Sequence, residues 1–544
     1  MSLDLIFRGA MVYDGTGAPG RKMDVALKNG RIAAVGDQVA GELANRVVDA
    51  GGLALAPGFI DMHTHSDLTL PAFPAAAHSV ARGVTSEVVG NCGFSPAPVS
   101  SDPALAAQLR GFVRGFGPDL DWSWNSFGSF LSRLDAARPA VNVVPLVGHG
   151  ALRIAVMGME DRKATQAEQD AMRAELAGAL KAGAWGMSSG LAYVPGIFAD
   201  VDEIAHVGAA LQAVDGLYAT HMRDEGDAIL PGIDEALAVG ERLNVRVEIS
   251  HLKAVGIQNH GRVAEALGQI GMARDRGLRV WCDVYPYTAG STYLSQLLPA
   301  WAMEGGIEAM IARLRSSEAR ARIRTEMESG VPGWSGRLRA AGGWHNVMIA
   351  NVGHPELRWA EGRRVTELAL AREVDPADLA LDLLTQDRGA TVMILFLMDE
   401  ADVRTVLRDP GTAIGSDQLG VTSAEKRVHP RAYGTSARML GWAVRDAGIM
   451  PLEEAVRKMS GLPAEILGLS NRGRVAPGMV ADLVAFDPET VRDEATYEQP
   501  TRLASGIEYV LIGGEFAVDR GVPVDLHRGR VLLRQDNRTQ VVAG

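Results

Sequence analysis

The sequence predicts an α/β protein in which a parallel (β/α)8 barrel carries a small β domain built from both chain ends. Between residues 57 and 466, short apolar stretches alternate with alanine-rich stretches of helical periodicity. Repeated alternation of this kind favours a parallel barrel whose strands are joined by helices. The alternative is an open doubly wound sheet, but no glycine-rich dinucleotide fingerprint within these residues supports it.

Both flanks of the chain have the pattern of short β-strands. Residues 3–55 contain apolar runs separated by turn signals, among them the hairpin dipeptide Asn29-Gly30. Runs at 481–486 and 509–514 look the same. Because each flank is too small to fold alone, we expect the two to pair; two independent decorations are the alternative. The predicted units are a β-sandwich of residues 1–56 and 467–528, the barrel of residues 57–466, and a peripheral tail of residues 529–544.

The barrel elements can be placed in order along the chain. After two strands that end near His63 and Cys92, strands are predicted at residues 141–147, 184–187, 217–220, 245–249, 278–284 and 413–415. Helices are predicted at residues 167–182, 234–242, 263–276 and 451–459. Residues 295–346 break this rhythm, because they are helical and rich in arginine. We interpret them as an insertion between late barrel elements, either a lid or a passive decoration.

Composition excludes several classes of function. The 54 Lys+Arg against 66 Asp+Glu give a formal net charge of −12, and the chain has no basic block, which argues against nucleic-acid binding. No run of about 18 apolar residues predicts a membrane span, and the first residues lack a signal-peptide pattern. The two cysteines, Cys92 and Cys282, make no disulfide framework. We therefore expect a cytoplasmic protein whose partner is a small molecule.

Residues that can bind a metal follow the predicted strands at one rim of the barrel. The active groups of a β/α barrel stand at the carboxyl ends of its strands. Six residues of this sequence occupy such positions: His63 and His65 after the first strand, Cys92 after the second, and His221, His251 and Asp417 after later strands. A His-x-His pair alone is more often two satisfied polar residues, but six such residues at one rim favour a metal centre.

The type of ligand indicates the metal and its chemistry. Thiolate and imidazole together select zinc among the common metals. Zinc lowers the pKa of a bound water to roughly 7 and polarises a carbonyl group. Asp417 is the expected acceptor of the water's proton, which it then passes to the leaving group. The alternative for Asp417 is a loop aspartate that caps the next helix.

Several segments around these residues carry further motifs. They are Pro57–His65, Gly90–Pro96, Ser188–Gly196, Thr220–Glu225, Ser250–Lys253, Tyr285–Thr292, Gly415–Asp417 and His429–Thr435. The first resembles the first-strand signature of the amidohydrolase superfamily, and the others resemble its N-acyl-D-amino-acid deacylase (D-aminoacylase) family. The resemblance extends from near residue 3 to about residue 520.

The resemblance implies a role for each candidate residue. It implies one tightly held zinc on Cys92, His221 and His251, and a second, weaker site on His63 and His65 that shares Cys92. Asp417 matches the catalytic aspartate, while Lys253, Tyr285 and Ser291 match the residues that hold the substrate carboxylate, and Tyr193 matches a tyrosine near the reacting carbonyl. Many relatives in the superfamily use a carboxylated lysine as the bridge; Ser188-Ser189 stand at that strand end here, so Cys92 fits the bridging role.

Strand alternation supports part of this assignment independently. Lys253 lies two residues beyond His251, so a continuing strand would point both side chains into the same cavity. The alternative for Lys253 is a structural ion pair. Cys282 points away from the face that Asp283 shares with Tyr285, so we expect Cys282 in the core.

The sequence also departs from the family pattern. Gln418 follows the catalytic aspartate where many relatives have glycine, and Thr435-Ser436-Ala437 stand where an aromatic residue and a proline are common. We expect both departures near the pocket wall, where they would affect the acyl or side-chain preference. His149 either lines the same mouth or is a structural loop histidine.

The main functional hypothesis is zinc-dependent hydrolysis of N-acyl-D-amino acids. Zinc-bound hydroxide attacks the carbonyl, and Asp417 protonates the departing amine. The alternatives are a cyclic amidase or other non-peptide amide hydrolase, and a non-enzymatic metal-binding scaffold, which the full set of ligands disfavours. A second cation in the pocket would indicate acidic substrates such as N-acyl-D-glutamate.

Overall fold

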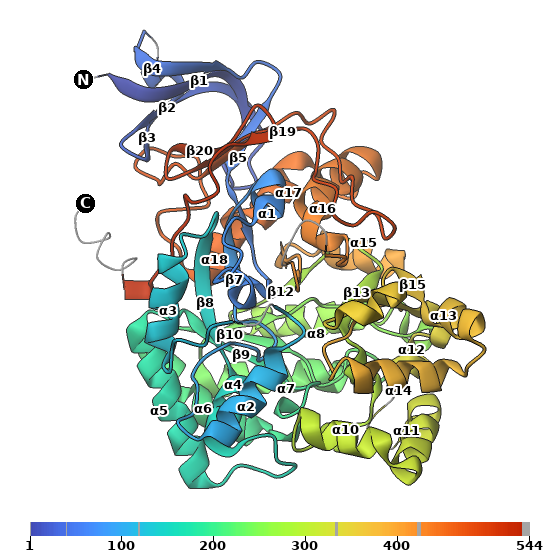
Figure 1. Cartoon of the computed structure of the whole chain (residues 1–544). Helices are drawn as coiled ribbons and strands as arrows, with labels where there is room; N and C mark the ends of the chain where they lie inside the picture. Colours follow the sequence, from blue (N-terminus) through green and yellow to red (C-terminus); the bar gives the residue numbers. More distant parts are fainter. Residues whose placement is uncertain are drawn as a thin grey trace.

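The computed structural model describes residues 2–39, 41–117, 120–331, 334, 336–421 and 426–535. Its centre is an eight-stranded parallel sheet (Figure 1). The strands are β6 (Phe59–Asp61), β7 (Val84–Val89), β8 (Asn142–Gly148), β9 (Gly186–Gly190), β10 (Leu217–His221), β11 (Arg246–Ile249), β12 (Val280–Val284) and β17 (Thr412–Ile414). Hydrogen bonds from Met62 N to Ile414 O (3.2 Å) and from Asp417 N to His63 O (2.7 Å) close the sheet into a barrel. The predicted α/β barrel is confirmed.

Helices connect these strands where the sequence predicts them. The four predicted helices correspond to α5 (Gln166–Ala182), α7 (Ile229–Leu243), α8 (Val263–Asp275) and α17 (Leu452–Met459). The others outside the insertion are α1 (Ala77–Ala81), α2 (Pro103–Val113), α3 (Phe127–Ala136), α4 (His149–Met157), α6 (Val201–Gly208), α15 (Glu400–Arg408), α16 (Arg431–Arg438) and α18 (Gly461–Leu467). Helix α5 shows the local cause: Thr165 and Glu168 form a capping box at its start. Its buried Met172, Leu176 and Leu180 recur at helical spacing.

The two chain ends form one domain, at the top of Figure 1. Its nine strands make a single sheet: β1 (Leu3–Val12), β2 (Arg21–Lys28), β3 (Arg31–Val35), β4 (Ala44–Asp49), β5 (Ala54–Pro57), β18 (Leu483–Phe486), β19 (Ile507–Ile512), β20 (Glu515–Asp519) and β21 (Val522–Pro523). Antiparallel pairing of β5 with β18 joins the flanks. Phe7 and Val25 from one flank share an apolar cluster with Leu483 and Leu511 from the other, so the sheet folds over a common core.

The insertion between β12 and β17 is larger than the predicted residues 295–346. It contains helices α9 (Ala300–Met303), α10 (Ile307–Arg315), α11 (Ser317–Ser329), α12 (Arg337–Ala340), α13 (Val365–Arg372) and α14 (Pro376–Gln386). It also contains an antiparallel sheet of β13 (Ala289–Tyr293), β16 (Val392–Phe396), β14 (Val347–Asn351) and β15 (Arg363–Arg364). The predicted bounds were wrong because this sheet and its helices alternate along the chain as barrel elements do. In Figure 1 the insertion forms a lobe beside the barrel.

The stretch that begins at residue 529 was expected to be peripheral. This was wrong over the part of it that the structure describes. Val531 pairs with Val143 of β8, and Leu532 N donates to Val143 O at 2.8 Å. The indole of Trp185 donates to Leu532 O at 2.6 Å. Both Val531 and Leu532 are buried, because they cover apolar side chains of the barrel. Residues 536–544 of the predicted tail lie outside the described residues.

This packing predicts a stability effect for a residue near the chain end. Substituting Leu532→Ala should lower the free energy of unfolding by about 2–3 kcal/mol, because it leaves a cavity beside Trp185. Chemical denaturation would measure the change. The matched control is Leu503→Ala, since Leu503 is 42% exposed and should lose less than about 0.5 kcal/mol. Equal effects at the two positions would contradict this account of the chain end.

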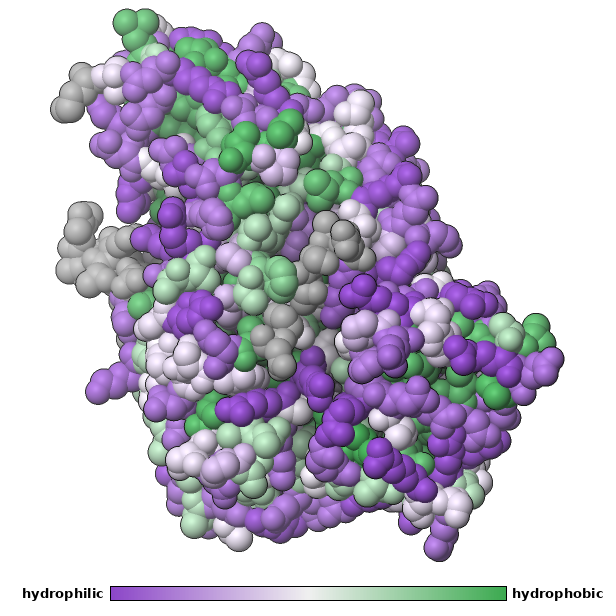
Figure 2. Space-filling view, viewed as in Figure 1, coloured by the Kyte–Doolittle hydropathy of each residue, from purple (hydrophilic) through white to green (hydrophobic). Residues whose placement is uncertain are grey.

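Among the described residues, no helix combines the length and the apolar character that crossing a bilayer requires. The face in Figure 2 is largely hydrophilic over the insertion, and its apolar residues lie in small groups.

Candidate metal centre

Five potential ligands converge at the carboxyl ends of the barrel strands. His63 and His65 follow β6, Cys92 follows β7, His221 ends β10 and His251 follows β11. Their donor atoms form two groups, each within 4.8 Å: His63, His65 and Cys92 in one, and Cys92, His221 and His251 in the other. All five side chains are buried, and Cys92 belongs to both groups.

The spacing of the donor atoms fits a tetrahedral zinc ion. Cys92 Sγ lies 3.7 Å from His221 Nδ1, 3.4 Å from His251 Nε2 and 3.2 Å from His63 Nε2. Zinc bonds of about 2.3 Å to sulfur and about 2.0–2.1 Å to nitrogen, at tetrahedral angles, separate such donors by roughly 3.5 Å. A buried thiol surrounded by three imidazoles at this spacing therefore has the chemistry and geometry of a zinc site.

The backbone at the site is locally strained. Cys92, His251 and Asp417 have φ values of 54°, 39° and 50°, in the left-handed region that side chains with a Cβ atom rarely adopt. Such outliers gather at functional sites, where the surrounding fold holds them. Position 90, two residues before Cys92, requires glycine, because a Cβ atom on Gly90 would lie 2.0 Å from Leu146 O. The sequence around Cys92 is thus fitted to a tight loop that presents the thiol.

Buried carboxylates orient the imidazoles from behind. His63 Nδ1 lies 3.2 Å from Asp283 Oδ2, and His251 Nδ1 lies 2.9 Å from Glu225 Oε1. Glu225 also approaches His221, with Oε2 3.5 Å from Nε2. A carboxylate on the second ring nitrogen fixes the tautomer, so that the other nitrogen faces the metal. Glu225 therefore supports two of the three ligands of the tighter predicted site.

Burial and neighbouring charge put two of the five ligands, Cys92 and His221, in their metal-binding forms. Burial raises the pKa of the Cys92 thiol, but the imidazoles of His63 and His251 outweigh burial and hold that pKa well below its ordinary value. Burial lowers the pKa of His221 to about 4, so its imidazole is neutral at pH 7. A thiolate and a neutral imidazole are the forms that bind metal.

Asp417 faces the same cluster. Its Oδ1 lies 3.4 Å from His65 Nε2 and 3.6 Å from His63 Nε2, and its Oδ2 lies 3.0 Å from Arg431 Nη2. Burial raises the pKa of the Asp417 carboxyl, but Arg431 and His63 outweigh burial and hold that pKa well below its ordinary value. Asp417 is therefore an ionised carboxylate at the cluster.

The predicted substrate-binding residues line a cavity of about 30 Å³ beside the cluster. Its walls include Tyr193, Lys253, Tyr285, Ser291 and Asp417. Lys253 reaches it by a route that the sequence did not predict: β11 ends at Ile249, before His251. Lys253 also pairs with Glu225, so it both forms an ion pair and lines the cavity.

The hydroxyl groups of the cavity differ in their present partners. Ser291 Oγ donates to Met393 O at 2.9 Å, and Tyr193 Oη lies 3.4 Å from Thr292 Oγ1. Burial raises the pKa of the Tyr285 hydroxyl, which therefore remains a donor. Tyr285 lies against both cations, with Lys253 Nζ 5.9 Å and Arg431 Cζ 4.5 Å from its ring centroid.

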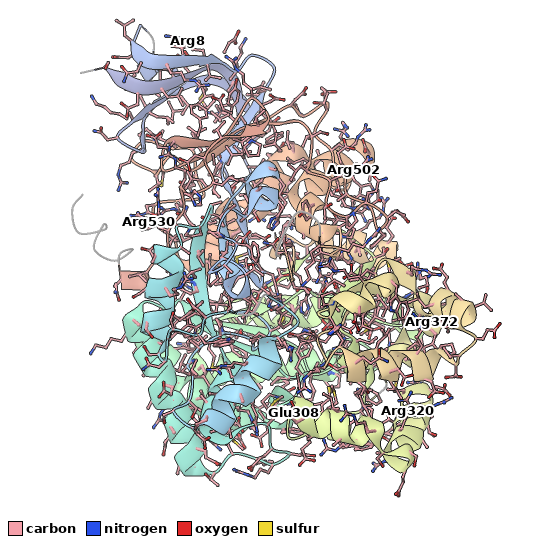
Figure 3. All side chains as sticks on the ribbon, viewed as in Figure 1. Arg8, Glu308, Arg320, Arg372, Arg502 and Arg530 are labelled. Carbon is pink, nitrogen blue, oxygen red and sulfur yellow. The ribbon has the colours of Figure 1, made fainter. Side chains whose placement is uncertain are left out.

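Sequence reasoning missed three residues of the site. Glu225 and Arg431 stand in segments that the family resemblance includes, yet no role was assigned to either. Arg337, from α12 of the insertion, lines the cavity with its Cζ 5.9 Å from the Tyr193 ring centroid. Other arginines of the insertion lie elsewhere: Figure 3 places Arg320 and Arg372 on its outer side, where they contact Asp378 and Trp359.

Three other expectations near the site have different outcomes. Gln418 and Ser436 were expected at the pocket wall, and this was wrong: the Gln418 amide bonds Glu87 and His78, and Ser436 Oγ donates to Arg82 O. His149 is fully buried and lies 3.0 Å from Glu203, so it is a structural histidine. Cys282 is a buried core residue, as expected.

The support given by Glu225 leads to a testable prediction. Substituting Glu225→Gln should weaken zinc binding by about 10–100-fold, because both His221 and His251 lose their anionic partner. Competition with a chromogenic chelator would measure the zinc dissociation constant. The matched control is Glu241→Gln, on the exposed surface of α7 and paired with Arg276. Zinc affinity unchanged in the Glu225 variant would contradict the assigned role.

Comparison with known proteins adds independent findings. The family described as "Amidohydrolase family" matches residues 46–518. Among curated proteins of Alcaligenes xylosoxydans xylosoxydans, an N-acyl-D-aspartate deacylase is 40% identical over 512 residues, covering 94% of this chain and 91% of its own. An N-acyl-D-glutamate deacylase is 38% identical over 534 residues, covering 98% and 97%.

Solved structures agree with these relatives. A D-aminoacylase, described as having a binuclear metal centre with one-metal activation and second-metal attenuation, superposes with a TM-score of 0.81 at 38% identity, over 98% of this chain and 100% of its own. An N-acyl-D-glutamate deacylase from Bordetella bronchiseptica, complexed with zinc and a phosphonate mimic of the tetrahedral intermediate, gives 0.82 at 34% identity with the same coverage.

Proposed function

The chain belongs to the amidohydrolase family, in its N-acyl-D-amino-acid deacylase branch, and on this premise we propose that it hydrolyses N-acyl-D-amino acids. The products are a carboxylate and a free D-amino acid. The observation that carries the proposal is the cluster of Cys92, His221 and His251 beside Asp417, because it combines a zinc site with a proton acceptor. The preference for the D configuration rests on the relatives.

Zinc is the cofactor of this reaction. Cys92, His221 and His251 would hold the tightly bound ion, and His63 and His65 with Cys92 would hold a second, weaker one. When bound, zinc polarises the substrate carbonyl and lowers the pKa of a water molecule.

Asp417 moves the proton in the reaction. Its Oδ1 faces the cluster, and Arg431 holds Oδ2 from the other side. The ionised carboxylate accepts the proton of the attacking water and then donates it to the nitrogen of the departing amine. Arg431 thus fixes the orientation of the carboxylate during both transfers.

The cations and hydroxyls of the cavity hold the α-carboxylate of the substrate. The cavity is lined by Lys253, Tyr285 and Ser291. Arg431 lies behind this lining, where its guanidinium contacts the ring of Tyr285. Arg431 Nε and Nη1 are buried and have no hydrogen-bond partner among the described residues. Charge-assisted hydrogen bonds to a carboxylate are about twice as strong as neutral ones, so a carboxylate is the ligand that suits these groups.

Arg337 indicates the side-chain preference. It gives the cavity a second cation besides Lys253. It belongs to α12 of the insertion, whereas the residues that bind the α-carboxylate belong to other elements. A cation at this place suits a substrate with a second carboxylate, and two relatives are named as deacylases of N-acyl-D-glutamate and N-acyl-D-aspartate. We therefore infer that the preferred substrates carry an acidic side chain.

Amine release by the zinc-loaded protein tests the function. The panel contains the N-acetyl derivatives of D- and L-glutamate, aspartate and methionine, together with a ring amide such as hydantoin. We expect turnover of the D-compounds, fastest for the acidic ones. Turnover of hydantoin alone would replace the deacylase assignment with a cyclic amidase, and turnover of the L-compounds alone would remove the D preference.

Substituting Arg337→Met tests the side-chain preference separately. We expect kcat/KM for N-acetyl-D-glutamate to fall by about 10–100-fold, the range for hydrogen bonds to charged groups, while N-acetyl-D-methionine is affected far less. The matched control is Arg339→Met on the same helix, because Arg339 pairs with Asp227. Equal losses for both substrates would contradict a role of Arg337 in selecting the side chain.

A further inference from the structure

A second cavity, of about 60 Å³, adjoins the catalytic one. Phe94 and Tyr193 belong to the walls of both cavities. We propose that this second cavity receives the acyl chain of the substrate, so that the enzyme favours unbranched apolar acyl groups longer than acetyl. This inference rests on the proposed deacylase function and names the acyl half of its substrate.

The position of the cavity relative to the metal cluster supports this use. The carboxylate-binding groups lie on one side, where Lys253 adjoins His251. Phe94 and Tyr193 lie on another side: their ring centroids are 6.0 Å from His65 and 4.6 Å from His221. A substrate whose α-carboxylate is directed toward Lys253 can present its acyl half to these two rings.

The lining of the cavity selects the chemistry of its ligand. Its walls are mainly apolar and include Phe112, Val194, Ile307 and Met310. Among the described residues that line it, none is charged, and the polar ones are uncharged, such as Gln296. An apolar chain gains free energy in such surroundings, whereas an anionic or amide-rich chain would lose its hydration without replacement.

A neighbouring polar cavity does not suit an alkyl chain. That cavity, of about 1050 Å³, has charged groups on its walls, among them Arg110, Arg358, Glu361 and Asp387. Phe116 helps to keep the catalytic cavity apart from it, because its ring stacks on His65 at 5.0 Å and contacts Phe94 at 4.7 Å. The apolar cavity is therefore the better match for an acyl chain.

Passage between the two cavities requires the partition of Phe94 and Tyr193 to open. Their rings meet edge to face, with centroids 5.1 Å apart. Phe94 is stacked on Phe112 at 4.4 Å and is held from behind. Tyr193 also packs on His221, with centroids 4.6 Å apart, and its hydroxyl lies 3.4 Å from Thr292 Oγ1. Admission of the chain requires the Tyr193 ring to rotate away from Phe94, because Phe94 is also stacked on Phe112.

The size of the cavity predicts the length of the acyl group. One water-sized group needs about 10–15 Å³ of this kind of space, so about 60 Å³ accepts on the order of four to six such groups. Each buried methylene should raise kcat/KM by up to about fourfold until the space is filled. A hexanoyl group should therefore be preferred to acetyl by at least about tenfold.

The test compares kcat/KM for N-acetyl-, N-butyryl-, N-hexanoyl- and N-dodecanoyl-D-glutamate with the zinc-loaded protein. We expect a rise from acetyl to hexanoyl and no further rise at dodecanoyl. No dependence on chain length, or a preference for acetyl, would overturn the inference while leaving the deacylase function intact. If none of the four compounds were hydrolysed, the proposed function itself would be refuted.

A variant that fills the cavity locates the effect. Gly111 of α2 lines the apolar cavity and also the polar one, and a Cβ atom there would lie 3.5 Å from Ile307 Cδ1, in ordinary contact. Gly111→Leu should lower the hexanoyl-to-acetyl ratio of kcat/KM at least about fivefold, and the smaller Gly111→Ala should lower it in the same direction. Ala107→Leu is the matched control: Ala107 lies on the same helix and lines the polar cavity but not the apolar one, so this variant should keep the ratio of the wild type. A ratio unchanged in both Gly111 variants would overturn the placement of the acyl chain.

Discussion

Substituting Asp417→Asn is expected to reduce kcat by at least about 10³-fold. Proton transfer by a positioned side chain contributes typically 10²–10⁴-fold, and here one group serves both the attacking water and the departing amine. Asparagine keeps the size of the side chain and can still accept a hydrogen bond from Arg431, but it cannot take up a proton. Steady-state kinetics with N-acetyl-D-glutamate would measure the loss.

Controls separate this effect from misfolding and from loss of metal. The Asp417→Asn variant should bind zinc with the stoichiometry of the wild type, because Asp417 belongs to neither of the two ligand groups. Asp446→Asn, at an exposed carboxylate paired with Arg445, should leave kcat unchanged. A loss of less than tenfold in the Asp417 variant would show that another group moves the proton.

Substituting Cys92→Ala is expected to remove tight zinc binding and, with it, activity by more than about 10³-fold. Cys92 is the only thiol in either ligand group of the described residues, and it lies 3.2–3.7 Å from three imidazole nitrogens. Its loss leaves imidazoles alone, without the negative charge that the thiolate supplies. Metal analysis of the purified variant, together with amine release at saturating zinc, would measure both effects.

The chain provides a matched control for this substitution. Cys282 is the other cysteine, equally buried, but it contacts Thr412 in the core and faces away from the cluster. Cys282→Ala should keep full zinc content and activity, with a loss of stability of about 1 kcal/mol. If Cys92→Ala retained zinc and turnover, the assignment of the metal centre would be wrong.

The fold and the metal cluster could be predicted because each depends on a local rule. Alternation of apolar strands and helices predicts a parallel barrel, and the carboxyl ends of its strands then meet at one rim. This rule brought His63, Cys92 and His221 together without knowledge of any distance. The tail beyond residue 528 and the extent of the insertion escaped prediction, because their positions depend on packing against distant strands.

The supporting residues could not be predicted for a related reason. Glu225 acts on His251, and Arg431 acts on Asp417, and only the folded chain brings these pairs to 2.9 Å and 3.0 Å. Lys253 reaches the cavity although the strand that was expected to carry it ends at Ile249. Gln418 shows the opposite error: its place beside Asp417 suggested the pocket wall, yet its amide turns to Glu87.

The most direct test of the account is a zinc titration of the metal-free protein, with N-acetyl-D-glutamate and its L enantiomer as substrates. The account predicts no turnover without zinc, a rise in D-glutamate release up to one equivalent of zinc per chain, and little release from the L enantiomer. Full activity without metal would contradict it, and so would absence of D-glutamate release when one zinc is bound.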